Sequence, residues 1–286
     1  MAERRRIVPY LLLGPGTIWL LLFFVVPLFY MGYLSLESGV VGSLSFTWNW
    51  SNYSEALSLY DTQFVRSFLY SGAATLLCLV ISYPLAYTIA FRAGKWRNAM
   101  LFAVVAPFFT TYLIRTLAWE TILSDQSPVV KALQLVGAVP QGGHVLATGS
   151  AVIAGLTYNF LPFMVLPIYA SLEQIDERLI EAAKDLYSSP RAAFWRVTLP
   201  LSAPGIVAGT LLTFIPAAGD YVNAQFLGSA GNQMIGNVIQ SLYKTQLDYP
   251  AASALSFVLM ALIMVFVIVY IRFAGSESLM GEEIPT

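Results

Sequence analysis

The chain has few of the residues that support metal, disulfide or nucleic-acid chemistry. Its 286 residues include one cysteine, Cys78, and one histidine, His144. These counts exclude an internal disulfide and a histidine-based metal or proton-relay cluster. Charged residues make up only 11% and the formal net charge is -1, so nothing suggests a basic surface for nucleic acid. No GxxxxGK[ST] phosphate loop occurs, so the chain itself is not expected to bind nucleotide.

Hydrophobic residues, by contrast, make up 57% of the chain, which indicates an integral membrane protein. No hydrophilic stretch is long enough for a soluble domain, and we expect one all-α transmembrane domain over residues 1–286. The first apolar run exceeds a signal-peptide core and ends without a small-residue cleavage pattern, so it also predicts a spanning helix. Six runs are long enough to span a bilayer: 7–36, 64–91, 100–123, 146–170, 201–218 and 251–272.

The distribution of Lys and Arg predicts the orientation of these spans, because cytoplasmic loops carry the excess. External segments hold only Lys131 and Lys244, and Arg66 lies near a boundary. Arg115 lies within the third run, and the remaining basic residues fall on the predicted cytoplasmic side: Arg4, Arg5, Arg6, Arg92, Lys95, Arg97, Arg178, Lys184, Arg191, Arg196 and Arg272. Six spans with both termini in the cytoplasm follow from this count.

Prolines and turn residues add local detail. Pro27 is expected to kink the first span, and Pro162 and Pro167 free backbone carbonyls in the fourth, which should therefore pack against neighbouring helices. A short amphipathic helix is expected at 129–136, within an external segment rich in turn residues.

A polar stretch, 181–209, separates the fourth and fifth runs. Residues 175–186 have the pattern of an amphipathic helix, and Ser189 before Pro190 predicts an N-cap for a second short helix that ends near residue 198. Small side chains at Ala182 and Ala183 would let a partner approach closely, and Glu181 could pair with a basic side chain there. The alternative is a solvated helix that merely joins two spans.

This stretch, with Leu199-Pro200 and Pro204-Gly205 after the Glu181-Ala182-Ala183 trio, resembles the cytoplasmic coupling loop of permease subunits of binding-protein-dependent ABC importers. Further blocks, in order along the chain, are similar to the spermidine/putrescine importer family, and to the first of its two paired permeases. These blocks are TYLIRTLAW from Thr111, YNFLPFM from Tyr158, IYASLE from Ile168, FIP from Phe214 with Gly219-Asp220, and MIGN from Met234.

The resemblance implies the six-helix type I ABC importer permease fold, with an importer core at about 64–272 and a coupling loop at about 171–199. In the family pattern the position of Tyr187 is usually glycine, which turns easily between the two short helices. Either the bend moves to Ser188-Ser189 or Tyr187 contacts the ATPase. The residues expected to dock the ATPase are Glu181, Ala182, Ala183, Asp185, Leu186, Tyr187 and Ser188.

The resemblance also implies the partners of a bacterial inner-membrane importer. They are a second, related permease, an ATPase subunit dimer and an external substrate-binding protein. ATP and Mg²⁺ would be bound by the ATPase, so this chain would be a non-catalytic subunit with no cofactor of its own. Spermidine and putrescine are the expected substrates. A homodimer of permeases and an importer of sugar, ferric ion or another organic cation remain alternatives.

Ionisable groups at membrane depth usually face protein or water, so they mark candidates for the solute path. Asp220 follows Pro216 and Gly219 at the outer end of the fifth span. Arg115 lies close enough to Trp119 and Glu120 for local stacking or a charge pair instead. The full set of path candidates is Asp220, Tyr221, Asn223, Tyr158, Asn159, Trp119, Glu120 and Arg115.

Two features bear on these candidates. For Tyr158 and Asn159 a hydrogen bond between helices is the leading alternative to a solute contact. External segments are acidic, which would suit a polycation but equally a binding protein; their acids are Glu37, Glu55, Asp61, Asp125, Asp220 and Asp248.

Two other classes of protein are alternatives. A secondary transporter would share the spans but not the coupling stretch. A membrane enzyme would need a cluster of His, Cys or carboxylate side chains, which the spans lack.

Overall fold

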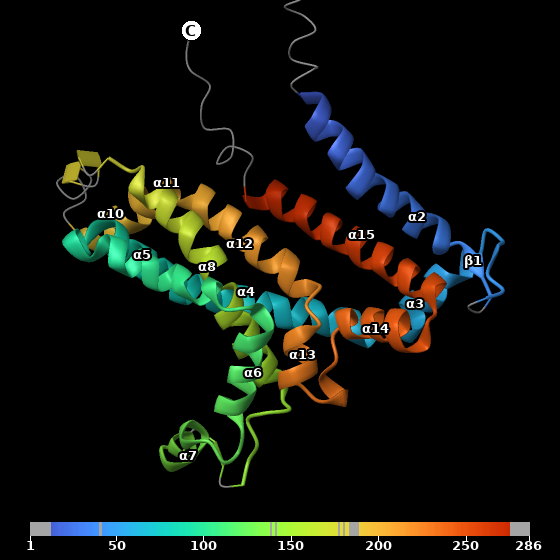
Figure 1. Cartoon of the computed structure of the whole chain (residues 1–286). Helices are drawn as coiled ribbons and strands as arrows, with labels where there is room; N and C mark the ends of the chain where they lie inside the picture. The colour runs from blue at the N-terminus through green and yellow to red at the C-terminus, as the bar shows by residue number, and fades with distance from the viewer. Residues whose placement is uncertain are drawn as a thin grey trace, which may run out of the picture. The chain divides into compact units, whose positions relative to one another are not determined.

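The computed structural model describes residues 13–39, 42–137, 139–140, 142–176, 178–179, 181–182 and 189–274. The chain divides into two compact units. The first unit comprises Met1–Asp61 and Val238–Ala261, and the second comprises Thr62–Asn237 and Leu262–Thr286. Figure 1 shows that both are built from helices.

The first unit begins with a helix whose π-helical turn, η1 (Leu21–Val25), runs into α2 (Val26–Leu34). Pro27 lies in the first turn of α2 and has no N–H to donate, which explains the irregular turn just before it. The remaining elements are β1 (Glu37–Ser38), β2 (Ser45–Phe46), α3 (Ser51–Leu59), the end of α14 (Ile235–Ser241), η6 (Leu242–Gln246) and the first part of α15 (Tyr249–Ala274).

The second unit holds the polar stretch and the path candidates. Its elements are α4 (Asp61–Phe91), η2 (Gly94–Trp96), α5 (Arg97–Val105), η3 (Ala106–Phe109), α6 (Tyr112–Leu123), α7 (Pro128–Leu135), α8 (Gly149–Glu173), α10 (Pro190–Ala193), η4 (Phe194–Thr198), α11 (Leu199–Leu201), α12 (Ala203–Ala218), α13 (Val222–Leu227) and η5 (Ala230–Asn232). The amphipathic helix expected at 129–136 is confirmed as α7, shifted by one residue, and its external position stays a prediction.

The six predicted spans are all found as helical segments. Among the described residues, four helices are long and apolar enough to cross a membrane: Leu13–Leu34, Asp61–Phe91, Gly149–Glu173 and Tyr249–Phe273. The third and fifth are bent pairs, Gly94–Phe109 with Tyr112–Leu123 and Pro190–Leu201 with Ala203–Ala218.

The prediction of one unbroken third span was wrong. The helix bends by 95° between Phe109 and Tyr112, and α6 turns away from α5 there (Figure 1). Thr110 and Thr111 are both extended at this point, and Thr111 takes the N-cap position of α6. Threonine disfavours the helix interior and suits extended backbone, so the break fits the local sequence.

α8 packs closely along α12, as expected for a span that contains two prolines. Gly205 and Gly209 of α12 are four residues apart and face α8. A Cβ on Gly205 would lie 2.5 Å from the carbonyl oxygen of Pro167, and one on Gly209 would lie 2.8 Å from Sδ of Met164. Small residues at this spacing let two membrane helices approach until their backbones touch.

Candidate functional site

The second half of the predicted coupling loop folds as expected. Ser189 Oγ accepts a hydrogen bond from the backbone N–H of Ala192 (3.2 Å), and Pro190 occupies the first helical position. The helix continues through η4 and α11 to Leu201, slightly beyond the predicted end, and then bends by 60° into α12. The predicted N-cap is therefore confirmed.

An aromatic cluster fixes this helix to the end of α4. The Phe194 ring lies 5.6 Å from the ring centroid of Tyr83 and 6.1 Å from that of Tyr87, both in edge contact. The Tyr83 hydroxyl also hydrogen-bonds Ser202 Oγ (2.9 Å) at the bend before α12. The second half of the loop is thus held to α4 at two points.

The first half of the loop starts from a second cap. Asp176 Oδ1 accepts from the backbone N–H of Arg178 (2.9 Å), as an N-cap does, and Arg178 and Leu179 are helical. Just before Asp176, Ile175 is buried in a cluster with Ile89 and Leu172. These contacts anchor the start of the predicted coupling helix to α4 and α8.

The predicted docking residues are only partly described. Glu181 and Ala182 are helical and exposed. The other five, which lie outside the described residues, are Ala183, Asp185, Leu186, Tyr187 and Ser188. Their docking role stays a prediction, as does the consequence of Tyr187 at the usual glycine position.

One contact beside the coupling loop was not predicted. Arg97, the first residue of α5, forms a salt bridge with Glu173, the last residue of α8. Arg97 Nε also donates to the Tyr169 hydroxyl (2.6 Å), which in turn hydrogen-bonds Glu173. We call these three residues the α5–α8 clasp. Both Arg97 and Glu173 were visible as charges near span ends, but their pairing depends on the tertiary fold.

The path candidates Asp220, Asn223 and Asn159 are brought together in one buried polar network. Asp220 Oδ1 accepts from the backbone N–H of Asn223 in the first turn of α13 (2.8 Å) and from Asn223 Nδ2 (3.3 Å). Asn159 Nδ2 of α8 donates to Asn223 Oδ1 (3.1 Å). The predicted interhelical hydrogen bond of Asn159 is therefore present.

Two α6 residues that were not among the candidates complete this network. The Tyr112 hydroxyl donates to Asp220 Oδ2 (2.5 Å) and accepts from Asn223 Nδ2 (2.6 Å). Thr116 Oγ1 accepts from Asn159 Nδ2 (3.3 Å). Tyr112 lies within the TYLIRTLAW block, so the family resemblance pointed to this segment. The contacts of Tyr112 with Asp220 and Asn223 could not be predicted from the sequence. The network joins α6, α8 and α13.

The remaining candidates lie outside these hydrogen bonds. Arg115 is 7% exposed, and its guanidinium lies over the rings of Phe108 (5.4 Å) and Tyr112 (5.6 Å) rather than beside Trp119 or Glu120. Among the described residues its Nε and Nη1 have no hydrogen-bond partner. Two aromatic rings near the buried guanidinium offset part of its desolvation.

Trp119, Glu120, Tyr158 and Tyr221 are all partly exposed. Trp119 meets Tyr158 edge to face, with ring centroids 5.4 Å apart, so these two candidates form a separate aromatic pair. Tyr221 accepts a hydrogen bond at its backbone oxygen from Asn237 Nδ2 (2.8 Å).

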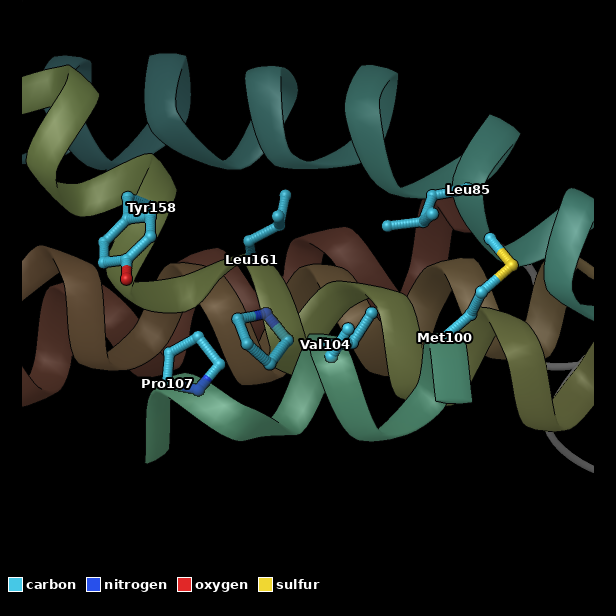
Figure 2. A pocket seen from close by; sticks show the side chains of 8 residues that line it. Leu85, Met100, Val104, Pro107, Tyr158 and Leu161 are labelled. Carbon is cyan, nitrogen blue, oxygen red and sulfur yellow. The ribbon is translucent and has the colours of Figure 1, made fainter. Parts of the chain in front are cut away.

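A cavity of about 320 Å³ lies between α4, α5 and α8 (Figure 2). Of its described lining residues none is charged, and Tyr158 carries the one polar side chain; the others are Leu85, Met100, Ala103, Val104, Pro107, Leu161 and Pro162. The cavity gives the ends of a polycation no counter-charge. Among the described candidates, the Asp220 network is the better place for such a solute to interact.

Comparison with known proteins places the chain in a family. Residues 82–275 match the family model described as the binding-protein-dependent transport system inner membrane component. The spermidine/putrescine transport system permease protein PotB of Haemophilus influenzae is 37% identical over 256 residues, which cover 89% of this chain and 90% of that protein. PotB of Escherichia coli (strain K12) is 36% identical over 256 residues, covering 89% and 93%.

Solved structures show the same fold. A bacterial ABC transporter involved in the import of the acidic polysaccharide alginate matches with a TM-score of 0.73 at 18% identity, over 96% of this chain and 98% of that chain. The MetNI methionine ABC transporter in an inward-facing conformation matches with a TM-score of 0.55 at 18% identity, over 77% and 94%. The fold is therefore that of a type I ABC importer permease, and the chain belongs to the family of binding-protein-dependent transport system inner membrane components, the transmembrane subunits of ABC importers.

Proposed function

We propose that the chain forms half of the membrane path of a polyamine importer, with spermidine and putrescine as its substrates. The observation that carries this proposal is the 37% identity to a spermidine/putrescine permease over 89% of the chain. A buried carboxylate at Asp220, within a network of hydroxyl and amide groups, is chemically suited to a passing ammonium group.

We infer further that the chain works in a bacterial inner membrane with three partners: a second, related permease, an ATPase dimer that binds ATP and Mg²⁺, and an external substrate-binding protein. Six spans enclose only part of a path, so a second permease supplies the other side. The similar structures come from ABC transporters, one of them an alginate transporter in complex with a periplasmic protein that holds an alginate pentasaccharide. In this arrangement the chain itself performs no catalysis.

The ATPase would dock on the loop that carries Glu181. Glu181 is helical and exposed, it follows the Asp176 cap along the chain, and the chain is fixed again at Ser189. A loop held at both ends costs less entropy to dock than a free one, because its anchored ends have little conformational freedom left to lose when a partner binds. Closure of the ATPase dimer would then move this loop and rock the spans about the shared path.

The substrate and energy source can be tested with the complete transporter in proteoliposomes. Labelled spermidine should enter only when the binding protein and ATP are both present, and an ionophore that collapses ion gradients should leave uptake unchanged. Uptake driven by an ion gradient without ATP would establish a secondary transporter. Uptake of a sugar or ferric ion, with no spermidine bound by the binding protein, would overturn the substrate.

The docking site can be tested by changing Glu181 and Tyr187 separately. Glu181→Ala and Tyr187→Ala should each weaken co-purification of the ATPase or lower transport-coupled ATP hydrolysis. Intact assembly together with normal coupled hydrolysis in both variants would remove the docking role from this loop.

A further inference from the structure

The interface between α5 and α8 is incompletely packed over part of its length. Met100, Ala103 and Val104 of α5 face Tyr158 and Leu161 of α8 across the cavity of about 320 Å³ (Figure 2). Close-packed helices transmit a displacement from one to the other. Atoms that line a void lack contacts on that side, so they transmit it less well. Apolar packing alone therefore holds α5 against α8 less firmly than it holds α12 against α8.

The α5–α8 clasp supplies a polar connection at the end of this interface nearest the coupling loop. Arg97 contacts both Tyr169 and Glu173, which lie one helical turn apart on α8. Its guanidinium also lies 5.2 Å from the centroid of the Tyr169 ring. Because an arginine fork and a ring plane have directional preferences, this contact fixes the register of the two helices in a way that apolar contacts do not.

The clasp connects two segments of the chain, one that leads to the coupling loop and one that leads to the buried polar network. Glu173 ends α8, and the Asp176 cap and the segment that carries Glu181 follow it. Arg97 starts α5, which continues through η3 to the 95° bend and then to Tyr112 of α6. Tyr112 in turn holds Asp220. A movement of the last turn of α8 would reach Tyr112 through α5 if Arg97 held the two helices together.

We propose that Arg97 is a positioning residue that couples the ATPase-docking loop to the bent third span through Tyr169 and Glu173. The inference rests on the proposed docking of the ATPase at Glu181. Arg97 and Glu173 are 34% and 47% exposed, so their ion pair contributes little to the stability of the fold. Its contribution is to make α5 move with α8.

The test uses the complete transporter in proteoliposomes and measures solute uptake per ATP hydrolysed. Arg97→Gln and Glu173→Gln should each lower this ratio about fivefold, within the range of coupling effects of residues that touch neither ligand. Co-purification of the ATPase should stay at the unmodified level. The exchanged pair, Arg97→Glu with Glu173→Arg, should recover most of the ratio. Lys95→Gln is the matched control, because it removes an exposed cation from η2, the turn just before Arg97.

Three outcomes would overturn the proposal: a normal ratio in both single variants, an equal loss in Lys95→Gln, or no recovery in the exchanged pair when that pair assembles normally. Glu181→Ala separates this proposal from the docking proposal. If Glu181→Ala uncouples the transporter and the clasp variants do not, the clasp is overturned and docking stands. The reverse pattern overturns docking at Glu181, and the proposed link from Arg97 to that loop falls with it.

Discussion

Tyr112 donates a 2.5 Å hydrogen bond to the carboxylate of Asp220, which lies 108 positions further along the chain. The same carboxylate accepts two hydrogen bonds from Asn223, so its oxygens are occupied in this structure. A cationic solute that interacts with Asp220 must compete with these donors or rearrange them. The same contact helps to hold α6 against α13. Making the Asp220 carboxylate available to a solute would therefore disturb the packing of these two helices.

Asp220→Asn should slow uptake of spermidine and leave assembly intact. The amide removes the negative charge and keeps one acceptor oxygen, which can serve the Asn223 N–H, while its NH2 group replaces Oδ2 and can donate to the Tyr112 hydroxyl. A loss of uptake with intact assembly would therefore report the charge. Glu55→Gln is the control, since it removes an exposed carboxylate from a segment predicted to be external. Unchanged uptake in Asp220→Asn, or an equal loss in Glu55→Gln, would remove Asp220 from the path.

Tyr112→Phe should destabilise the protein by about 1–3 kcal/mol, the cost of leaving a buried acceptor unpaired. The hydroxyl is the described donor to Asp220 Oδ2. Thermal unfolding of the purified transporter would measure the change, and Tyr158→Phe provides a comparison at a partly exposed tyrosine. Equal stability of Tyr112→Phe and the unmodified protein would mean that the network contributes nothing to the packing of α6.

Gly205→Ala should destabilise the second unit by about 1–3 kcal/mol through overpacking. The added methyl group would lie 2.5 Å from the Pro167 carbonyl oxygen and 2.6 Å from Ser171 Oγ, so α8 and α12 would have to separate. Gly72→Ala is the matched control, because its new Cβ would meet no atom within 4 Å. A Gly205→Ala variant that unfolds no earlier than Gly72→Ala would contradict the close packing.

Ser189→Ala should increase hydrogen exchange at the start of α10 about fivefold, because an N-cap contributes about 1 kcal/mol. Its hydroxyl accepts from the Ala192 N–H, and alanine cannot replace that acceptor. Ser189→Asp keeps an acceptor and should restore protection. Identical exchange in all three proteins would show that the cap does not stabilise this helix.

The orientation predicted from Lys and Arg can be tested by cysteine labelling from outside the cell. Cys78 is buried, so the native cysteine should not react. Leu135→Cys on α7, where leucine is 88% exposed, should react with a membrane-impermeant maleimide. Trp96→Cys, at a residue 64% exposed, should react only after the membrane is permeabilised. The opposite pattern would invert the topology.

The sequence predicts the features that depend on local chemistry. Hydrophobic run length predicts the four unbroken spans and locates the two bent pairs. The Ser189-Pro190 pair predicts both the cap and the start of the second helix of the coupling loop, because cap and helix lie within four residues. Pro162 and Pro167 predict a span that must pack among others. The Gly205–Gly209 spacing is also a local signal of close packing, but nothing in the sequence says that α8 is the partner.

Contacts between distant residues could not be predicted. The α5–α8 clasp joins Arg97 to Glu173, and the polar network joins Tyr112 to Asp220, so both depend on how the helices pack. The 95° bend was missed because apolar composition continues through Thr110 and Thr111, and span prediction reads composition rather than backbone conformation. Asp220 was selected by the cost of burying a charge, and it proved to be at the centre of the network.

Site-specific photo-cross-linking from position 181 tests the central claim most directly, because that claim is docking of an ATPase on the loop that carries Glu181. A benzophenone amino acid at position 181 of the assembled transporter should form a covalent adduct with the ATPase subunit, and the same probe at position 135 on α7 should not. Adducts at 181 that contain only lipid or the second permease, in a complex that retains its ATPase, would contradict the account.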